Sequence, residues 1–127
     1  MKHITTYILL SLALLSLSSC HKEENDLFAT AVITLNTTES LTISQVQAQA
    51  EITNVNTRQT TTTANFDGTM LRVDLLRGAY SVLIEGVATC YYSDGTKRLR
   101  QFRAQTDYVE FAGKETNATT LNIIFLD

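Results

Sequence analysis

The chain has 127 residues, with 10 basic and 13 acidic side chains and a net charge of −3, so it has the length of one domain and lacks the general cationic character that binds nucleic acid. It contains two cysteines, two histidines and neither proline nor tryptophan, which excludes a disulfide-stapled scaffold and a zinc finger with several Cys and His ligands. Threonine is abundant, at 20 residues, and its β-branched side chain suits strands better than helix interiors.

The first nineteen residues have the pattern of an export signal. Met1, Lys2 and His3 form a short positive start, and residues 4–17 that follow carry no charge. A charged start, an apolar stretch and a cleavage site with small residues are typical of a secretory signal peptide. The apolar stretch is too short to cross a bilayer, which takes about 20 apolar residues. We therefore predict a signal peptide over residues 1–19.

The apolar stretch ends in Leu17-Ser18-Ser19-Cys20. This tetrapeptide resembles the bacterial lipobox, in which the cysteine becomes the first mature residue and is acylated on its sulfur and its amine. The resemblance implies that Cys20 carries several acyl chains and ties the protein to a membrane, because two or more chains give stable anchoring at about 0.8 kcal/mol per buried methylene. The alternative is an ordinary signal peptide in which Cys20 is incidental.

Residues 20–26 consist of this cysteine and a polar segment with three acids and no apolar side chain. We expect the segment to be a solvated tether between the lipid and the folded domain. It resembles the Lys- and acid-rich segment that follows the lipidated cysteine in surface-exposed lipoproteins of Bacteroidetes-type bacteria. The resemblance implies a lipid-anchored outer-membrane protein that faces the cell surface; the alternative is a tether without sorting information on a periplasmic protein.

Residues 27–127 predict a single all-β domain, because apolar and polar side chains alternate repeatedly along the chain. The alternation is clear in a first strand over residues 27–35 and in a second over residues 44–53. Alanine and glutamine in the second stretch favour helices, so a helix at 44–53 is the alternative there. The expected inward side chains of these two strands are Leu27, Ala29, Ala31, Ile33 and Leu35, and Val46, Ala48, Ala50 and Ile52.

Turn signals divide the remaining sequence into further strands. Asp67-Gly68 and Asp94-Gly95 predict tight hairpins, because glycine tolerates the positive φ of such turns, and Arg77-Gly78 predicts another turn. Together these signals give about seven strands, the number typical of a β-sandwich of this length. The expected later strands cover residues 59–66, 71–75, 79–92, 97–111 and 119–126.

Residues 46–86 resemble the transthyretin-like, or carboxypeptidase-regulatory-like, β-sandwich. In that family a Gly-x-Tyr-x-Val unit opens a central strand, and Gly78-Ala79-Tyr80-Ser81-Val82 has this pattern. The resemblance implies an antiparallel sandwich of immunoglobulin-like or transthyretin-like type. Such domains are common accessory domains of bacterial surface lipoproteins, including precursors of fimbrial subunits.

The distribution of histidine argues against an enzyme. His3 belongs to the expected signal and His21 to the tether, so residues 27–127 contain no imidazole to activate a serine or cysteine nucleophile, or to bind zinc. Turn formation explains Asp67 and Asp94, and most other acids fall on outward strand positions or in loops. We predict a non-enzymatic domain with no catalytic residue, no metal site and no cofactor.

Cys90 is the only cysteine that remains if Cys20 is lipidated. Its alternation with Ile84, Gly86 and Ala88 places it on the inner face of a strand. A free cysteine in that position behaves as a small apolar side chain, so we expect Cys90 to be buried.

The hairpin at Asp94-Gly95 gives one candidate binding patch. A two-residue turn would pair Tyr91 with Arg98, Thr89 with Arg100 and Val87 with Phe102, on the face opposite Cys90 and Leu99. In that register Gln101 points inward, which hints at a bulge. The patch of Tyr91, Arg98, Arg100 and Phe102 would be exposed and suited to stacking on sugar rings or anchoring a protein. The alternative is a solvated edge whose charges prevent aggregation.

The sequence therefore favours a non-enzymatic cell-envelope lipoprotein whose sandwich mediates protein–protein contact, as an accessory or adhesin-like subunit. Its expected partners are the membrane, through Cys20, and a protein of the envelope, but not nucleic acid. The first alternative is a glycan-binding module that uses the aromatic side chains Tyr91, Tyr92, Phe102 and Tyr108. A further alternative is a periplasmic inhibitor or chaperone-like factor.

Overall fold

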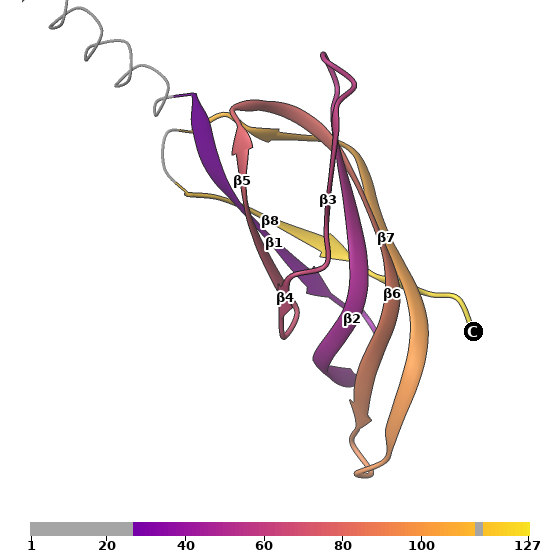
Figure 1. The fold of residues 1–127 in the computed structure, drawn as a ribbon. Coiled ribbons are helices and arrows are strands. Elements are labelled where there is room, and N and C mark those ends of the chain that lie inside the picture. Colours follow the sequence, from indigo (N-terminus) through magenta and orange to yellow (C-terminus); the bar gives the residue numbers. More distant parts are fainter. Residues whose placement is uncertain (1–26, 114–115) are drawn as a thin grey trace, which may run out of the picture.

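A computed structural model describes residues 27–113 and 116–127 (Figure 1). Within these two ranges every regular element is a β-strand, so the predicted all-β fold is confirmed. The same residues accordingly include no helix of the length and apolar character needed to span a bilayer. The expected signal peptide, the lipidated Cys20 and the tether lie outside the described residues.

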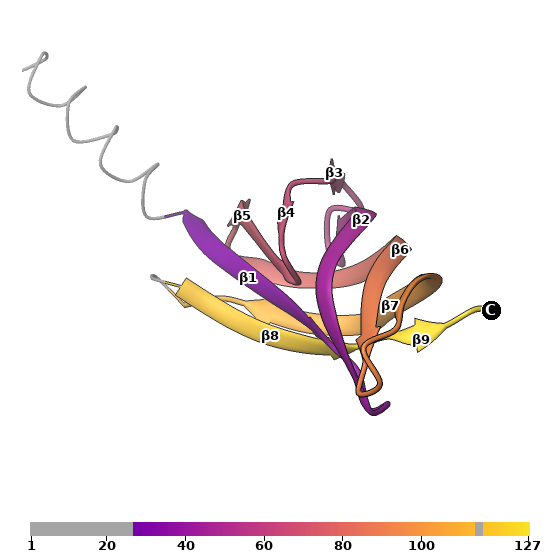
Figure 2. The same cartoon turned by 90° about the horizontal axis from the view of Figure 1, so that it is seen from below.

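The strands form two sheets that enclose one apolar core (Figure 2). One sheet has four strands in the order β4–β5–β1–β8, and the other has five in the order β3–β2–β6–β7–β9. The strands are β1 (Phe28–Asn36), β2 (Leu41–Asn54), β3 (Thr60–Thr63), β4 (Phe66–Asp67), β5 (Met70–Leu76), β6 (Gly78–Tyr92), β7 (Lys97–Phe111), β8 (Thr116–Asn122) and β9 (Ile124–Phe125).

The alternation read from the first two strands is confirmed, except that the expected inward position of Leu27 is wrong: Leu27 precedes β1 at the end of the sandwich and is exposed. In β1, Ala29, Ala31, Ile33 and Leu35 are buried. The stretch 44–53 lies within β2, so the helical alternative is wrong; its alanines and glutamines adopt the strand because the inward positions are buried against the opposite sheet. A bulge at Ser44, between Ile43 and Gln45, interrupts the pairing of β2 with β6.

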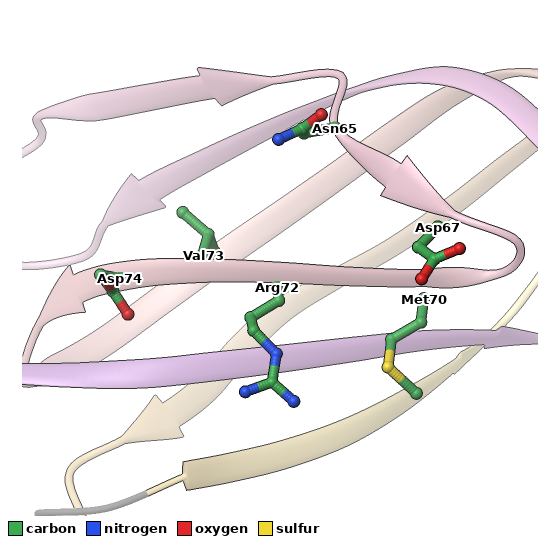
Figure 3. Close-up of a pocket in the computed structure, with 6 residues that line it drawn as sticks. All are labelled: Asn65, Asp67, Met70, Arg72, Val73 and Asp74. Carbon is green, nitrogen blue, oxygen red and sulfur yellow. The ribbon is translucent and has the colours of Figure 1, made fainter.

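Two expected strands are each divided between the sheets. The stretch 59–66 becomes β3 in the five-stranded sheet and β4 in the four-stranded sheet, and β4 pairs with β5 only at Phe66 and Asp67 (Figure 3). The stretch 119–126 becomes β8 and β9, separated at Ile123, whose N–H donates to the Asn36 carbonyl at 2.8 Å. The described chain therefore has nine strands, because a segment that changes sheet must leave one ladder before joining the next.

The predicted antiparallel arrangement holds for every strand pair of the described residues but one. Strands β1 and β8 run parallel, in a register that extends from Thr30 beside Thr116 to Asn36 beside Asn122. Strand β1 thus lies between an antiparallel neighbour, β5, and a parallel one, β8.

A tyrosine fastens the chain where it passes from β5 to β6 and changes sheet at Arg77. The Tyr80 hydroxyl donates to the Leu76 carbonyl at 2.5 Å, while its ring packs against Phe111 with the centroids 5.9 Å apart. Both Tyr80 and Val82 are buried. The Gly-x-Tyr-x-Val pattern is therefore explained locally: the glycine begins the strand, and the next two alternate residues face the core.

A close approach of two strands requires glycine at position 86. A Cβ atom there would lie 2.3 Å from the Gln47 carbonyl oxygen and 2.5 Å from the Ala48 Cα. We expect Gly86→Ala to lower the free energy of unfolding by about 1–3 kcal/mol, measured by urea denaturation. The added Cβ would clash with backbone atoms of β2, which can move only if the strand itself shifts. The matched control is Gly78→Ala, whose new Cβ meets nothing closer than 3.4 Å; an equal loss in both variants would contradict the argument.

Candidate functional site

The β6–β7 hairpin closes through three residues, Ser93, Asp94 and Gly95. The Tyr92 N–H donates to the Thr96 carbonyl at 2.9 Å, and the Gly95 N–H donates to the Tyr92 carbonyl at 3.0 Å. Gly95 has a φ of 87°, in the left-handed region. A three-residue hairpin with glycine in that conformation is a common alternative to the two-residue turn. The predicted two-residue turn is therefore wrong.

The longer loop shifts the pairing of β6 and β7 by one residue from Tyr91, beside the loop, as far as Val82. A shift of one residue turns each β7 side chain to the opposite face of the sheet. Arg98, Arg100 and Phe102 consequently share a face with Cys90, while Leu99 and Gln101 share the face of Tyr91. The observed pairs are Tyr91 with Lys97, Cys90 with Arg98, Ala88 with Arg100 and Gly86 with Phe102.

The structure does not assemble the predicted patch of Tyr91, Arg98, Arg100 and Phe102. Phe102 has an exposed fraction of 0% and belongs to the core, and the Arg100 side chain is only 14% exposed. Tyr91 and Arg98 are both exposed, but on opposite faces of the sheet. The exposed Gln101 needs no bulge of its own, because the corrected register already points it outward.

A bulge does occur in this hairpin, farther from the loop. Tyr80 pairs with Val109, whereas Val82 pairs with Thr106, so two residues of β7 oppose the single Ser81. Between the bulge and the end of β7 at Phe111, the pairs follow the register that the sequence predicts. The bulge thus separates three correctly predicted pairs from the ten pairs, between the bulge and the loop, that are displaced by one residue.

The aromatic side chains of the glycan-binding hypothesis are also dispersed. Phe102 is buried, and the Tyr92 hydroxyl accepts a hydrogen bond from Arg100 at 3.2 Å. Tyr91 and Tyr108 are exposed but lie near opposite ends of the hairpin. The Tyr108 hydroxyl donates to Glu110 at 2.5 Å, and this bond raises the pKa of Tyr108. No surface that gathers these rings is therefore present in the described hairpin.

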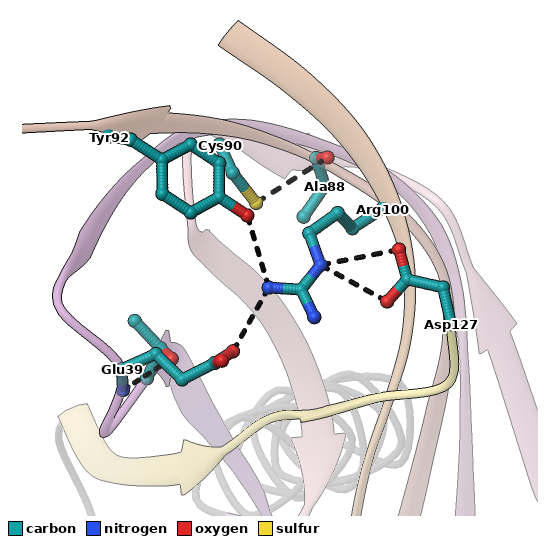
Figure 4. A network of polar contacts seen from close by, with 7 residues as sticks. Glu39, Ala88, Cys90, Tyr92, Arg100 and Asp127 are labelled. Atoms are coloured by element: carbon teal, nitrogen blue, oxygen red, sulfur yellow. Dashed lines mark hydrogen bonds and ion pairs between the residues drawn. The ribbon is translucent and has the colours of Figure 1, made fainter. Parts of the chain in front are cut away.

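Arg100 instead organises a polar network that the sequence did not reveal (Figure 4). Its Nε donates to the Asp127 carboxylate at 3.1 and 3.3 Å, and its Nη1 donates to Glu39 at 3.1 Å as well as to Tyr92. The guanidinium carbon lies 3.9 Å from the centroid of the Phe125 ring. The partners come from the β1–β2 loop, the end of β6 and the segment after β9, so one side chain joins three distant parts of the chain.

The charged network around Arg100 fastens the C-terminal segment and the β1–β2 loop to the β6–β7 hairpin, and we call it the Arg100 clamp. Burial lowers the pKa of Arg100, but the hydrogen bonds to Asp127 and Tyr92 outweigh burial, and the net effect is a raised pKa. The guanidinium therefore stays charged, and both carboxylates are engaged by it rather than turned toward a ligand. Nothing in the sequence marks Glu39 and Asp127 as its partners, because they lie 61 and 27 residues from Arg100.

Cys90 lies beneath this network and is fully buried, as predicted. Its thiol is 3.8 Å from the Ala88 carbonyl oxygen. Burial raises the pKa of the Cys90 thiol, and Arg100 opposes this effect only in part. The thiol therefore remains protonated and inaccessible, which are the properties of a packing side chain rather than a nucleophile.

A different surface lies along the outer edge of β5. One depression of about 470 Å³ is lined by Asn65, Asp67, Met70, Arg72, Val73 and Asp74. Figure 3 shows Val73 pointing from β5 toward the segment that carries Asn65, while Arg72 points the opposite way. A second depression of about 150 Å³ adjoins it at Asp74 and reaches across to Thr61 on β3. The two depressions form a side opening between the edges of the sheets.

The outer edge of β5 offers free backbone groups. Strand β4 pairs only with Met70 and Leu71, so among the described strands none covers the edge from Arg72 to Leu76. On the other side, the Arg77 N–H donates to the Leu27 carbonyl. Because the backbone groups of successive strand residues point to alternate sides, the odd-numbered residues of β5 direct theirs to β1 and the even-numbered residues direct theirs to the outer edge. The amide and carbonyl groups of Arg72 and Asp74 consequently face the opening.

An apolar side chain accompanies these free groups. Leu71 and Leu75 are buried at 0% and 4% exposure, but Val73, which points inward between them, is only half-buried. The alternation of the sequence predicts the inward position of Val73, but its partial exposure depends on β4 ending after two residues. The candidate site is therefore the β5 edge, which we define as residues 72–76 with Val73 at its centre.

No group of three or more His, Cys, Asp and Glu side chains that could hold a metal ion occurs within residues 27–113 and 116–127. The acids near the β5 edge are Asp67 and Asp74, and the Asp74 carboxylate accepts a hydrogen bond from the Thr30 hydroxyl at 2.9 Å. Arg72 supplies a positive charge between them. The edge thus combines backbone donors and acceptors, one apolar position and charges of both signs.

The Arg100 clamp makes a prediction for the last strand. We expect Arg100→Gln to accelerate hydrogen exchange of the Leu126 amide, which donates to the Gln101 carbonyl at 2.9 Å, by about tenfold or more, because a local loss of about 1.4 kcal/mol changes an opening equilibrium tenfold. The matched control is Arg103→Gln, which breaks an exposed ion pair with Glu85 and should leave that amide unchanged. Equal exchange rates in the two variants would contradict the clamp.

Comparisons with known proteins identify the architecture. No model of a known family matches the sequence, and no curated protein is significantly similar to it. The structure is similar to the crystal structure, at 2.50 Å, of a DUF4876 family protein from Bacteroides thetaiotaomicron VPI-5482, with a TM-score of 0.58 and 15% identity over 78% of this chain. The match covers 24% of that protein, so the chain spans about a quarter of its length. At this identity the likeness establishes a shared β-sandwich fold.

Proposed function

We propose that this protein is a non-enzymatic cell-envelope lipoprotein whose β-sandwich binds a partner protein by accepting an extended segment along the β5 edge. The observation that carries the proposal is the pair of free backbone positions at Arg72 and Asp74 on either side of the half-buried Val73. Addition of a strand to an exposed sheet edge is a common mode of peptide recognition. The partner segment would continue the line of the short strand β4.

The energetics of such binding follow from the groups on the edge. An added strand would bond to the amide and carbonyl groups of two residues, and each hydrogen bond contributes about 0.5–1.5 kcal/mol net. Alternate side chains of the added strand would face opposite ways. An apolar residue would cover Val73, and polar or charged neighbours would meet Asp74 and Arg72, so backbone pairing supplies affinity and the side chains supply selectivity.

Lipidation and membrane attachment form the second part of the proposal. The tetrapeptide Leu17-Ser18-Ser19-Cys20 after an apolar stretch supports acylation of Cys20, and the acidic tether supports an outer-membrane location with the domain at the cell surface. The Gly78–Val82 pattern, with the Tyr80 bond across the change of sheet, supports placing the domain among transthyretin-like sandwiches. As an accessory or adhesin-like subunit, the domain would be held at the membrane while it contacts its partner.

Photo-crosslinking in intact cells tests the β5 edge. We expect a photoreactive amino acid in place of Val73 to give a discrete protein adduct, and Asp74→Pro to abolish it, because proline removes an amide that faces the opening and leaves the ladder to β1 intact. The matched control is Thr62→Pro on the edge strand β3, which should keep the adduct. An adduct that survives Asp74→Pro, or no adduct at position 73, would count against strand addition.

Protease treatment of intact cells tests the location. We expect an added protease to remove the domain while a periplasmic marker stays intact, because a surface lipoprotein is exposed to the medium. The control is Cys20→Ser, which cannot be acylated and should no longer be retained at the surface. A wild-type domain that stays protected until the outer membrane is permeabilised would assign the protein to the periplasmic side.

A further inference from the structure

Four exposed apolar side chains gather at one end of the sandwich. They are Leu27 (56% exposed), Phe28 (50%), Leu76 (44%) and Val55 (37%). They come from the start of β1, the end of β5 and the loop that joins β2 to β3. Figure 1 shows that these three places lie at the same end of the molecule. We call this surface the apolar end.

Backbone contacts link the segments that carry these four side chains. Phe28 and Leu76 are register partners in neighbouring strands. The Arg77 N–H donates to the Leu27 carbonyl at 2.7 Å, and a depression of about 420 Å³ beside these two residues is lined also by Gly78 and Ala112. The Val55 N–H donates to the carbonyl of Ala79 at 2.9 Å, which joins the β2–β3 loop to the start of β6.

The composition of the apolar end resembles that of surfaces that lie at a lipid interface. Apolar and aromatic side chains can enter the boundary between headgroups and acyl chains, and cations beside them attract lipid phosphates. Arg58 provides such a cation: it is exposed in the β2–β3 loop and has a φ of 65°. Val55 is in the same loop, so a cationic and an apolar side chain are presented together.

The position of the membrane anchor determines what this surface meets. Six residues separate Cys20 from Leu27, and a chain of that length spans at most about 25 Å when fully extended. Leu27 is itself part of the apolar end. A lipid-anchored Cys20 would therefore hold the apolar end within reach of the bilayer.

We propose that the apolar end lies against the lipid surface to which Cys20 anchors the protein, with Phe28 and Leu76 at the level of the headgroups. The inference rests on the proposed lipidation of Cys20 and adds to it a fixed orientation. Strand β1 would rise from the membrane, and the β6–β7 hairpin loop would point away from it. The β5 edge would lie on the side of the domain, open to a partner.

Tryptophan fluorescence provides the test, because the natural chain has no tryptophan. Phe28→Trp places a single reporter at the apolar end. Leu99→Trp is the matched control on β7, where Leu99 is 67% exposed. The end of β7 nearest the apolar end is Phe111, and Leu99 is twelve residues from it, or about 40 Å along the strand. Both positions are exposed, so both variants are expected to fold. The full-length lipidated proteins are reconstituted onto phosphatidylethanolamine–phosphatidylglycerol vesicles that include lipids brominated near the headgroup.

We expect both proteins to float with the vesicles, and the Phe28→Trp emission to be quenched at least about twofold more than that of Leu99→Trp. Adding Leu76→Ser to Phe28→Trp should reduce the quenching, because it weakens the apolar contact without removing the anchor. Flotation with equal quenching at both positions would overturn the orientation and leave the lipoprotein proposal standing. Failure of either protein to float would overturn the anchor and, with it, the orientation.

Discussion

Strand β6 is hydrogen-bonded on both sides over nearly its entire length, and the rest of the fold depends on this double pairing. Strand β2 pairs with it from Tyr80 to Tyr92, and β7 pairs with it from Gly78 to Tyr91. Its inward side chains lie at the centre of the core, and Gly86 at its middle permits the close passage of β2. At its beginning, Tyr80 bonds back to β5 and ties the two sheets together.

The two sheets end differently on their outer edges. Strand β7 is partly covered by β9, and Arg100 holds the following segment in place through Asp127 and Phe125. Strand β5 has only the two-residue β4 beside it. Because an uncovered strand edge is a template for further pairing, natural sheets usually protect such edges with charges or short strands. Arg72 and Asp74 provide the charges here, and under the proposed function they would restrict the edge to segments of complementary charge.

The sequence predicts the features of this fold that depend on local alternation, but not those that depend on pairing with distant segments. Local alternation correctly placed β1, β2, β5, β6 and β7, because a half-buried strand needs only a period of two. It could not predict where a strand divides, because the changes of sheet at Ala64 and Ile123 depend on which distant ladder accepts the next residues. Both divided stretches therefore read as single strands.

The candidate binding surfaces were less predictable than the fold. A difference of one residue in the loop at Asp94 and Gly95 reversed the faces of Arg98, Arg100 and Phe102, because a change of turn length shifts the register of every pair up to the next bulge. The Arg100 network joins residues far apart in the sequence, and the β5 edge is defined by a neighbour that stops early. The burial of Cys90 was predictable because it depends on β6 alone.

The parallel pairing of β1 with β8 has a mechanical consequence. Strand β1 is held by seven register pairs to β5 on one side and by seven to β8 on the other. Tension applied at the start of β1 against a load at the end of β8 is directed along the strand axes, because the two strands are parallel and these points lie at opposite ends of their ladder, so its seven pairs are sheared together instead of being unzipped one by one. Rupture then requires crossing the unfolding barrier of the whole sheet, and its rate rather than its equilibrium sets the lifetime of the connection. The strand nearest the proposed anchor is thus the one best placed to carry force.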